Sequence, residues 1–442
     1  MKRVLMLIIA ILMLIFMNAC TKEAESSKAT ASTDEGCPRD IKATLSFGTW
    51  DADAMKLYDE LDIESRFQQL YPNVTLEIEE YKDDTEYFNA MKIRASAKEL
   101  PDIMFNETVT LANFAEYLYD LSDLDATKNN ILAEGYAIDG KVLGLPEKRQ
   151  EEYVLFWRDM FDEAGVEVPQ TWDEFIKVSI RLQEYFSKSN PNFMAIALGA
   201  KDEWPIYPLV ENMPSAISGN GQYWNEMAEK DRPFEKGSDI QVAYEKINDF
   251  FHTGVFGKDP LGMGYDQAFS IFTQKNAAMA MDSPMGLTGI YSAGVDTTNL
   301  ESFYLPFRED ASDPLYLPVR GDFLMGITTS TENYDLARAF VEFYFSDAWY
   351  PDYIAKLSSA STMSTVEKQL DPVLESANTN SSNVSIYTYD GGGAKFQSLI
   401  TETRFDYKKL GAKMFTPDFD LDEALEKLNN DWTAARKSLG YK

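Results

Sequence analysis

The chain has 442 residues, 45% of them hydrophobic and 26% charged, which excludes wholesale disorder and predicts two or three structural units. Its 72 Asp and Glu residues outnumber 41 Lys and Arg residues, and the formal net charge is −31. Such an acidic surface repels phosphate backbones, so we expect no nucleic-acid partner. His252 is the only histidine, which excludes multi-histidine metal centres, and we expect no metal or other cofactor.

The N-terminus predicts export and anchoring. Lys2 and Arg3 precede fourteen apolar residues, 4–17, a run of the length found in signal peptides and too short to span a bilayer. Asn18-Ala19-Cys20 follows and resembles a bacterial lipobox. We therefore predict a signal peptide over residues 1–19 and a lipid such as palmitate on Cys20. The alternative is an ordinary signal peptide that is cleaved nearby without lipidation.

Residues 20–40 are rich in Ser, Thr, Ala, Lys and Glu and show no apolar periodicity. This composition predicts a flexible tether that holds the folded part away from a membrane. Cys37 is the only cysteine besides Cys20, so no disulfide framework is expected. Cys37 either keeps its thiol or forms a disulfide with another chain, and we favour the thiol.

From residue 41 the hydrophobic pattern changes to that of a folded domain. Apolar and polar residues alternate over 41–47, helical spacing follows over 53–70, and alternation returns over 74–78. A second helical stretch over 84–98 precedes a short apolar run at 103–105. The order strand, helix, strand, helix, strand predicts an α/β unit with a largely parallel sheet.

A similar texture recurs after residue 150. We predict helices over 172–186, 240–251, 265–275, 333–345 and 421–439 and buried strands over 193–198 and 277–281. Thr171 and Glu174 have the spacing of a capping box at the start of the first of these helices. Residues 376–393 are rich in Ser, Asn and Gly, which predicts an exposed loop.

Three stretches resemble a known family when they are taken together and in order. They are LPDIM at 100–104, the run at 138–175 that contains IDGKVLGLP, LFWRDMFDEAG and TWDEF, and KNAAMAMDSPM at 275–285. They resemble the extracellular solute-binding proteins of carbohydrate ABC importers, the maltose-binding-protein-like group (solute-binding protein family 1). The resemblance extends over nearly the whole chain from residue 41.

The resemblance implies a two-lobed α/β fold of the periplasmic-binding-protein type, with three interlobe crossing segments and a central ligand cleft. Carried over, it predicts an N-terminal lobe of residues 41–148 and 285–345 and a C-terminal lobe of residues 149–284 and 346–442. The crossings are then expected near 146–153, 282–285 and 345–348. Where the family commonly has Tyr-Asn, this chain has Phe156-Trp157.

The candidate ligand-binding residues combine aromatic rings with planar polar groups, because sugars offer apolar C–H faces and many hydroxyls. Most of them follow predicted strands, where a parallel sheet presents its ligand-facing loops. The candidates are Trp50, Asp51, Asn106, Glu107, Glu147, Arg149, Trp204, Trp224, Asp282, Arg320, Asp322 and Tyr389.

Several of these residues have an alternative interpretation. Trp50 and Trp204 could belong to the core, whereas Trp224 and Tyr389 could be exposed loop aromatics without a ligand. Glu147 could form a salt bridge at the first crossing instead of binding a ligand. Trp172 lies within an amphipathic pattern, which is typical of a core residue.

These observations favour a monomeric, lipid-anchored receptor on the extracellular face of the cytoplasmic membrane. It would bind a carbohydrate, which the resemblance implies is an oligosaccharide, and deliver it to an ABC permease without chemistry. The alternative is a secreted carbohydrate-processing enzyme that uses two carboxylates. A structural or adhesive lipoprotein is the third hypothesis. No pair of catalytic carboxylates can be singled out from the sequence.

Overall fold

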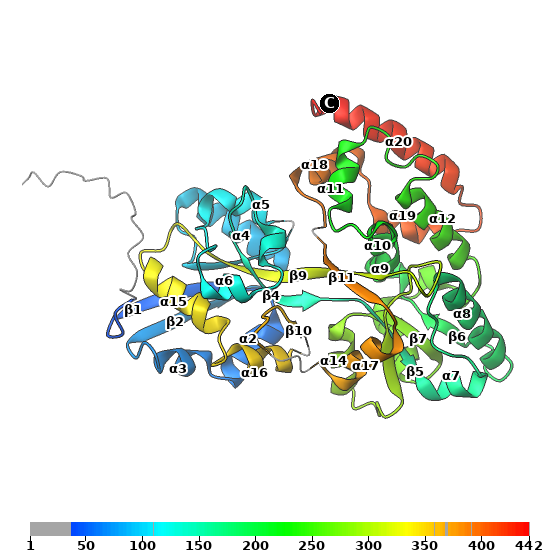
Figure 1. The fold of residues 1–442 in the computed structure, drawn as a ribbon, viewed down its shortest axis with the longest axis horizontal. Coiled ribbons are helices and arrows are strands. Elements are labelled where there is room, and N and C mark those ends of the chain that lie inside the picture. Colours follow the sequence, from blue (N-terminus) through cyan, green and yellow to red (C-terminus); the bar gives the residue numbers. More distant parts are fainter. Residues whose placement is uncertain (1–36, 109, 358, 367–369, 390, 442) are drawn as a thin grey trace, which may run out of the picture. The chain divides into compact units, whose positions relative to one another are not determined.

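The computed structural model describes residues 37–108, 110–357, 359–366, 370–389 and 391–441. The predicted signal peptide, Cys20 and almost all of the predicted tether lie outside these ranges. None of the helices in the described ranges is long and apolar enough to cross a membrane. The residues from Pro38 onward form one unit, which contains two sheets (Figure 1).

The first sheet is the framework of the N-terminal lobe. It begins with β1 (Ala43–Thr49), β2 (Val74–Glu80) and β3 (Ile103–Asn106), which are parallel, with β1 between the other two. The connections contain α2 (Ala52–Glu60), α3 (Ile63–Gln68) and α4 (Asp84–Ala97). This is the predicted strand–helix order, and it directs the ends of β1 and β3 to one edge of the sheet.

Two antiparallel strands complete this sheet. The long strand β9 (Leu315–Ile327) pairs with β3 on one side and with β4 (Leu145–Gln150) on the other. The short strand β10 (Ala360–Ser361) pairs with β4. The sheet order is therefore β10-β4-β9-β3-β1-β2, with β11 (Val384–Thr388) pairing to the first part of β9.

Aromatic side chains fill one side of the first sheet. Phe47 of β1 contacts Tyr58 of α2 at 5.6 Å between ring centroids and Phe340 of α15 (Tyr334–Tyr344) at 5.5 Å. Tyr58 also stacks on Tyr353 of α16 (Tyr350–Lys356) at 5.6 Å. These contacts join α2, α15 and α16 to the sheet although the helices are far apart in sequence. The remaining helices of this region are α5 (Leu111–Phe114) and α6 (Asp125–Asn129).

The second sheet is the framework of the C-terminal lobe, with the order β6-β7-β5-β8. Its strands are β5 (Tyr153–Trp157), β6 (Met194–Ala197), β7 (Ala277–Asp282) and β8 (Leu300–Phe303). Every residue of β5, β6 and β7 is buried, as expected for strands that are covered on both faces. The predicted strands at 193–198 and 277–281 are thereby confirmed.

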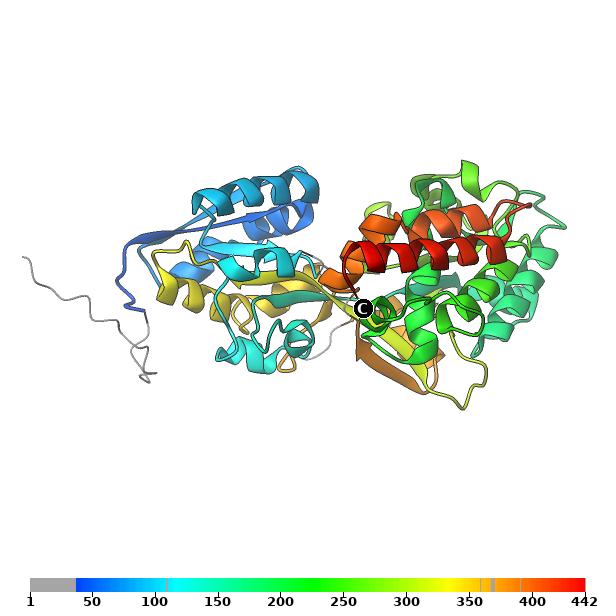
Figure 2. The same cartoon turned by 90° about the horizontal axis from the view of Figure 1, so that it is seen from above.

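Helices surround the second sheet and form most of this lobe. The helix α20 (Leu421–Ser438) packs beside α18 (Ala394–Thr403), as both views show (Figures 1 and 2). The others are α7 (Arg158–Ala164), α8 (Trp172–Phe186), α9 (Tyr207–Val210), α10 (Asn212–Ser218), α11 (Tyr223–Glu229), α12 (Asp239–Phe251), α13 (Tyr265–Thr273), α14 (Pro284–Ser292), α17 (Pro372–Asn380) and α19 (Tyr407–Met414). Thr171 caps α8 by accepting from the Glu174 backbone N–H, as the capping box predicts.

The predicted lobe boundaries at 284/285 and 345/346 differ from the strand pairing. β8 pairs with β5 of the second sheet, so β8 and the preceding helix α14 belong to the C-terminal lobe. The chain returns to the first sheet only with β9. Residues 346–361 stay with the first sheet because β10 pairs with β4. These pairings join residues distant in sequence, so local patterns do not reveal them.

Two predictions about single elements are wrong. The expected helix over 53–70 is divided into α2 and α3, because Asp62 adopts a left-handed conformation and caps α3 through the Ser65 N–H. The expected loop over 376–393 contains α17 and β11. β11 obtains its hydrogen bonds from β9, a partner about 70 residues away in the sequence.

Candidate functional site

The site is built on one face of the paired strands β4 and β9. Lys148 is opposite Asp322, and Gln150 is opposite Arg320. All four side chains are partly exposed, whereas the intervening residues Arg149 and Gly321 are buried. Alternation along the two strands therefore places four polar groups on the same face.

Lys148 connects this strand face to the loop after β1. Its Nζ forms an ion pair with Asp51 Oδ2 at 2.9 Å and lies 4.2 Å from the ring centroid of Phe323. Burial alone would lower the pKa of Lys148, but Asp51 and Asp322 raise it above its ordinary value. Lys148 therefore remains charged and fixes the position of Asp51.

Trp50 is partly buried beside this ion pair. Its ring stacks on Phe323 at 4.6 Å with an interplanar angle of 23°, and it also contacts Tyr87 at 4.6 Å and Phe88 at 5.1 Å. Phe323 has a φ of 50°, a left-handed conformation that is rare for a bulky residue. Strain of this kind persists where the surroundings impose it, often at ligand sites.

A second polar group forms around Arg320. Its guanidinium approaches Glu211 Oε1 at 3.4 Å and Gln150 Oε1 at 3.3 Å, and the Tyr389 hydroxyl donates to Glu211 at 3.1 Å. Burial opposes the charge of Arg320, but Glu211 outweighs it and raises the pKa. Tyr389 is 1% exposed, so the expectation of an exposed loop residue is wrong.

Three further residues extend this group toward the second sheet. The Tyr207 hydroxyl donates to Glu152 Oε1 and receives a 3.5 Å contact from Gln150. At the end of β7, Asp282 Oδ2 accepts from the Tyr265 hydroxyl at 2.7 Å. Asp282 is 6% exposed, and burial raises its pKa to about 6.

Trp204 lies next to this part of the site. Its ring is 4.6 Å from that of Tyr265 and is partly exposed. The preceding residue, Glu203, has φ 62° and ψ −47°, a strained conformation for a residue with a side chain. Trp204 and Tyr265 thus form an aromatic pair near the second sheet, and Trp50 and Phe323 form a comparable pair near the first.

A pocket of about 580 Å³ connects residues of the two sheets. Its wall contains Asp51, Lys148, Gln150 and Asp322 from the first group and Ser283, directly after β7. The rest of the lining comes from α2, α14 and α16, together with Arg149, Leu357 and Ser359. The volume lies within the range of small-molecule sites.

Glu107 follows β3 and is coupled to the same site. Its pKa is raised to about 7, chiefly by burial and also by Asp322 and Asp84, although Arg320 and Lys408 lower it. The adjacent residue Asn106 is fully buried, with neither side-chain polar atom hydrogen-bonded to another described residue. Of this predicted pair, only Glu107 has a side chain that is partly exposed.

Glu147 and Arg149 lie on the buried face of β4. Glu147 accepts hydrogen bonds from the hydroxyls of Tyr344 at 2.6 Å and Tyr353 at 3.0 Å and is 1% exposed. Arg149 forms a buried ion pair with Glu151 at 2.5 Å. Glu147 has no salt bridge with another described residue. Strand alternation directs Lys148 and Gln150 to the site, and Arg149 also borders its pocket.

Trp224 is a candidate ligand-binding residue, and the alternative interpretation of it as an exposed loop aromatic is wrong. It lies on α11, is fully buried, and packs between Phe396 at 5.1 Å and Tyr407 at 5.8 Å. Its neighbours come from α18 and α19, so the local sequence gives no sign of its burial. The geometry therefore assigns Trp224 to packing.

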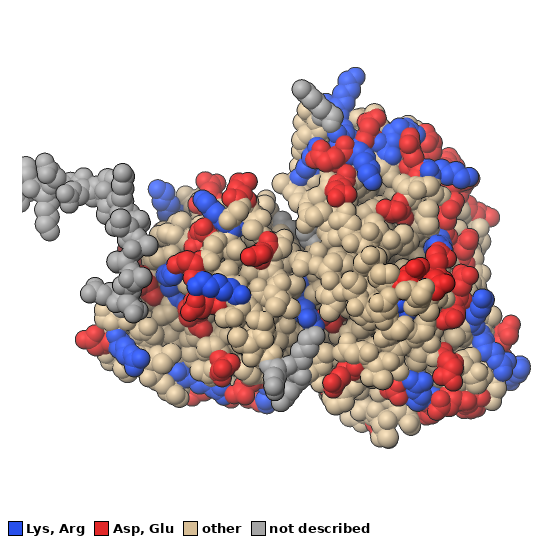
Figure 3. All heavy atoms as spheres, in the orientation of Figure 1, with Lys and Arg blue, Asp and Glu red and all other residues tan. Residues whose placement is uncertain are grey.

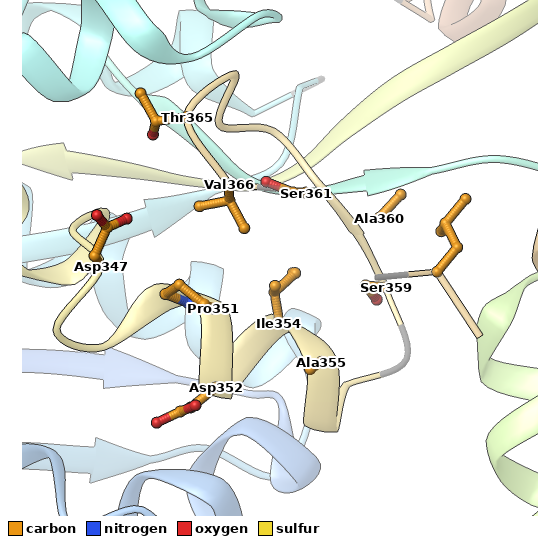
Figure 4. Close-up of a pocket in the computed structure, with 11 residues that line it drawn as sticks. Asp347, Pro351, Asp352, Ile354, Ala355, Ser359, Ala360, Ser361, Thr365 and Val366 are labelled. Atoms are coloured by element: carbon orange, nitrogen blue, oxygen red, sulfur yellow. The ribbon is translucent and has the colours of Figure 1, made fainter. Parts of the chain in front are cut away.

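A separate hollow of about 320 Å³ contains none of the predicted site residues. Figure 4 shows Ile354 of α16 and Val366 pointing toward one another across it. On the outer surface, acidic and basic side chains are interspersed over the face in Figure 3. In the described part of the chain, no three Cys, His, Asp or Glu side chains gather in an arrangement that could hold a metal ion.

The sequence profile of bacterial extracellular solute-binding proteins matches residues 49–351, more than half of the chain. The chain belongs to this family. A Multiple sugar-binding protein of Streptococcus mutans is 21% identical over 263 residues, which cover 57% of this chain and 60% of the relative. The Melibiose/raffinose/stachyose-binding protein MelE of Bacillus subtilis is 30% identical over 105 residues, 22% of this chain and 24% of MelE. The chain thus spans less than two thirds of these relatives in the matched regions.

Solved structures of solute-binding proteins share the fold. Unliganded RafE of Streptococcus pneumoniae aligns with a TM-score of 0.72 and 19% identity, covering 91% of this chain and 100% of RafE. BlMnBP1 of Bifidobacterium animalis subsp. lactis, in complex with mannobiose, aligns at 0.68 and 16%, covering 90% and 96%. The predicted two-lobed α/β fold of this family is thereby confirmed.

Proposed function

We propose that this solute-binding protein is a carbohydrate receptor that delivers an oligosaccharide to an ABC import permease. The observation that carries the proposal is the pocket beside β4 and β9, where polar groups of the first sheet face Ser283 and α14 and Lys148 contacts the Phe323 ring of the Trp50–Phe323 pair. The sugar-binding names of its relatives support the same ligand class. The related proteins are binding proteins, and we propose that this chain also acts without chemical turnover.

The residues suit a sugar in two respects. The pairs Trp50–Phe323 and Trp204–Tyr265 offer aromatic surface for apolar C–H faces. Asp51, Asp322 and Gln150 offer planar acceptors for hydroxyl groups. We propose these residues, with Arg320 and Glu107, as ligand contacts.

Calorimetric titration of the purified protein with raffinose, stachyose and mannobiose tests the receptor function. We expect saturable binding of at least one sugar and unchanged sugar on chromatography after overnight incubation. A sugar that is cleaved, with cleavage lost on replacing one carboxylate, would instead support a carbohydrate-processing enzyme. Absence of binding across a wider panel of oligosaccharides would contradict the receptor function.

We also propose that Cys20 carries the lipid that anchors the receptor at the extracellular face of the membrane, and that the receptor acts as a monomer. Replacing Cys20 with Ala should release the protein into the medium, because the variant has no cysteine to carry the acyl chains that hold it at the membrane. Sugar binding should be unchanged, since Cys20 precedes the folded residues. Membrane-bound protein in the Cys20→Ala strain would contradict the anchor.

A further inference from the structure

Glu152 has an unusual environment at the crossing between β4 and β5. The side chain is only 7% exposed, and its Oε1 accepts from the Tyr207 hydroxyl. Its Oε2 is buried and has no hydrogen-bond partner among the described residues. Because burial disfavours the charged form, the pKa of Glu152 rises to about 8. A buried carboxylate oxygen without a donor is costly.

The cations nearby are committed to other carboxylates. Arg320 pairs with Glu211, and Lys148 pairs with Asp51. Neither Glu152 nor Asp282 has a salt bridge within the described ranges. Burial is the largest influence on the pKa of Glu152 and raises it; the Tyr207 hydroxyl and Arg320 lower it, and Asp282 and Glu211 raise it, so that the net pKa is about 8. By contrast, the adjacent Glu151 has both an ion pair with Arg149 and a hydrogen bond from Tyr153.

Strand pairing brings the two carboxylates together. Tyr153, the residue after Glu152, is opposite Asp282 in the β5–β7 pair. Asp282 is itself held by Tyr265, whose ring contacts Trp204. A donor group here would meet two acidic side chains and an aromatic pair, and a cation is favoured by both.

We propose that this end of the site binds the ammonium group of an amine-bearing sugar, with Glu152 as its principal acceptor. The inference rests on the proposed carbohydrate-receptor function and specifies its ligand class. Neutral sugar hydroxyls form weaker hydrogen bonds to a carboxylate than an ammonium does. Acidic sugars are disfavoured because they add negative charge beside Asp282, which is mostly ionised at pH 7 with its pKa of about 6. The net charge of −31 also attracts cationic ligands.

Binding should be linked to proton release. At pH 7 Glu152 is mostly protonated in the unliganded protein, as its pKa of about 8 implies. An arriving ammonium ion favours the carboxylate, so the carboxyl proton passes to the buffer while the ligand keeps its own three N–H bonds. A neutral sugar gives no comparable release, which makes the two ligand classes distinguishable.

The experiment compares chitosan oligosaccharides of two to four units, which carry free amines, with N-acetylated oligosaccharides of the same length. Titration calorimetry at pH 6, where the chitosan amines arrive largely as ammonium groups and Glu152 is protonated before binding, measures affinity and proton release in two buffers of different ionisation enthalpy. We expect the amine forms to bind at least about tenfold more tightly, as for a charge-assisted hydrogen bond, and to release protons. In Glu152→Gln both the preference and the release should disappear, whereas Glu309→Gln, which alters an exposed carboxylate paired with Lys246, should keep both.

Tyr207→Phe provides a second test if Glu152→Gln does not fold, because it retains the carboxylate and should retain the preference for amines. Equal or weaker binding of the amine forms, or binding without proton release, overturns the inference. If raffinose binds while no amine form does, the inference fails and the receptor function stands. If no carbohydrate of either kind binds, both fail.

Discussion

The Trp50 ring contacts both the lobe interior and the site, since it packs on Tyr87 and Phe88 as well as on Phe323. Trp50→Ala should weaken sugar binding by about 1–3 kcal/mol because one aromatic plate is lost. It should also reduce the free energy of unfolding, but by less than the loss of a fully buried tryptophan. Titration calorimetry and a denaturation curve measure the two effects separately.

Trp172 is the matched control. It is 2% exposed on α8 and contacts Phe250 at 5.2 Å, so Trp172→Ala should cost about 3–5 kcal/mol of stability. Sugar affinity of the folded fraction should be nearly unchanged. Normal binding with an early melting transition in Trp50→Ala would show that Trp50 is a core residue and that it does not contact the ligand.

Some site residues were predictable from the sequence because they follow strands. Trp50 and Asp51 come directly after β1, and the ends of parallel strands share an edge. The position of Lys148 was also predictable, because alternation along 145–150 places Lys148 and Gln150 on one face of the strand and Glu147 and Arg149 on the other. Glu211 was not, because it lies between the short helices α9 and α10 and meets Arg320 only through the tertiary fold.

At the scale of elements, the start of α14 is hydrogen-bonded to a residue of the site. The Ser283 N–H donates to Asp282 Oδ1 at 2.8 Å, while Oδ2 is held by Tyr265. A Cβ atom at Gly286 would lie 2.3 Å from the Asp282 carboxyl group, so the carboxylate would have to move. Gly286→Ala should therefore cost about 1–2 kcal/mol in weakened hydrogen bonds to the Asp282 carboxylate, more than the gain of up to about 1 kcal/mol from Ala in a helix.

Gly289→Ala in the same helix is the control for this change. Its added Cβ would meet only the Phe269 ring, at 3.3 Å, and a ring edge can shift. Because Gly289 itself lines the pocket, the two variants are compared by stability: we expect a near-normal melting temperature for Gly289→Ala and a lower one for Gly286→Ala. Equal behaviour of the two variants would show that the position of Asp282 is unimportant.

The errors at this scale have a common physical cause. The Ser- and Asn-rich composition of 376–393 favours a loop locally, yet Val384, Ile386 and Thr388 alternate with other residues and pair with β9. Non-local pairing outweighs local preference in strands. Helices with a strong apolar stripe, such as α8 and α15, depend less on distant partners and were predictable.

For the molecule as a whole, buried carboxyl groups make stability depend on pH. Burial raises the pKa of Glu147 to about 7 from an ordinary 4.5. Protonated Glu147 therefore contributes fully to the free energy of unfolding below about pH 4.5. This contribution, about 3 kcal/mol, is lost as the pH rises through 7. Glu152 and Glu107 act in the same direction. Melting temperature without ligand should therefore fall between pH 5.5 and 8.5.

Glu147→Gln should make this pH dependence shallower, because an amide can exchange hydrogen bonds with Tyr344 and Tyr353 without ionising. Glu301→Gln serves as a control, since Arg158 lowers the pKa of Glu301 and its effect is confined to more acidic solution. Melting curves at half-unit pH intervals compare the three proteins. An unchanged slope in Glu147→Gln would mean that Glu147 does not titrate in this range.

The position of β9 in the first sheet constrains the order in which the chain can fold. β9 lies between β3 and β4, but it is synthesised about 170 residues after β4. Until residue 327 is available, β3 and β4 each present an unpaired edge, and such edges invite aggregation. Closing so long a loop before its contacts form also slows folding. A chain shortened before β9 should therefore remain unfolded and bind chaperones. The pairing of β9 with β3 and β4 thus both builds the ligand site and completes the folding of the N-terminal lobe.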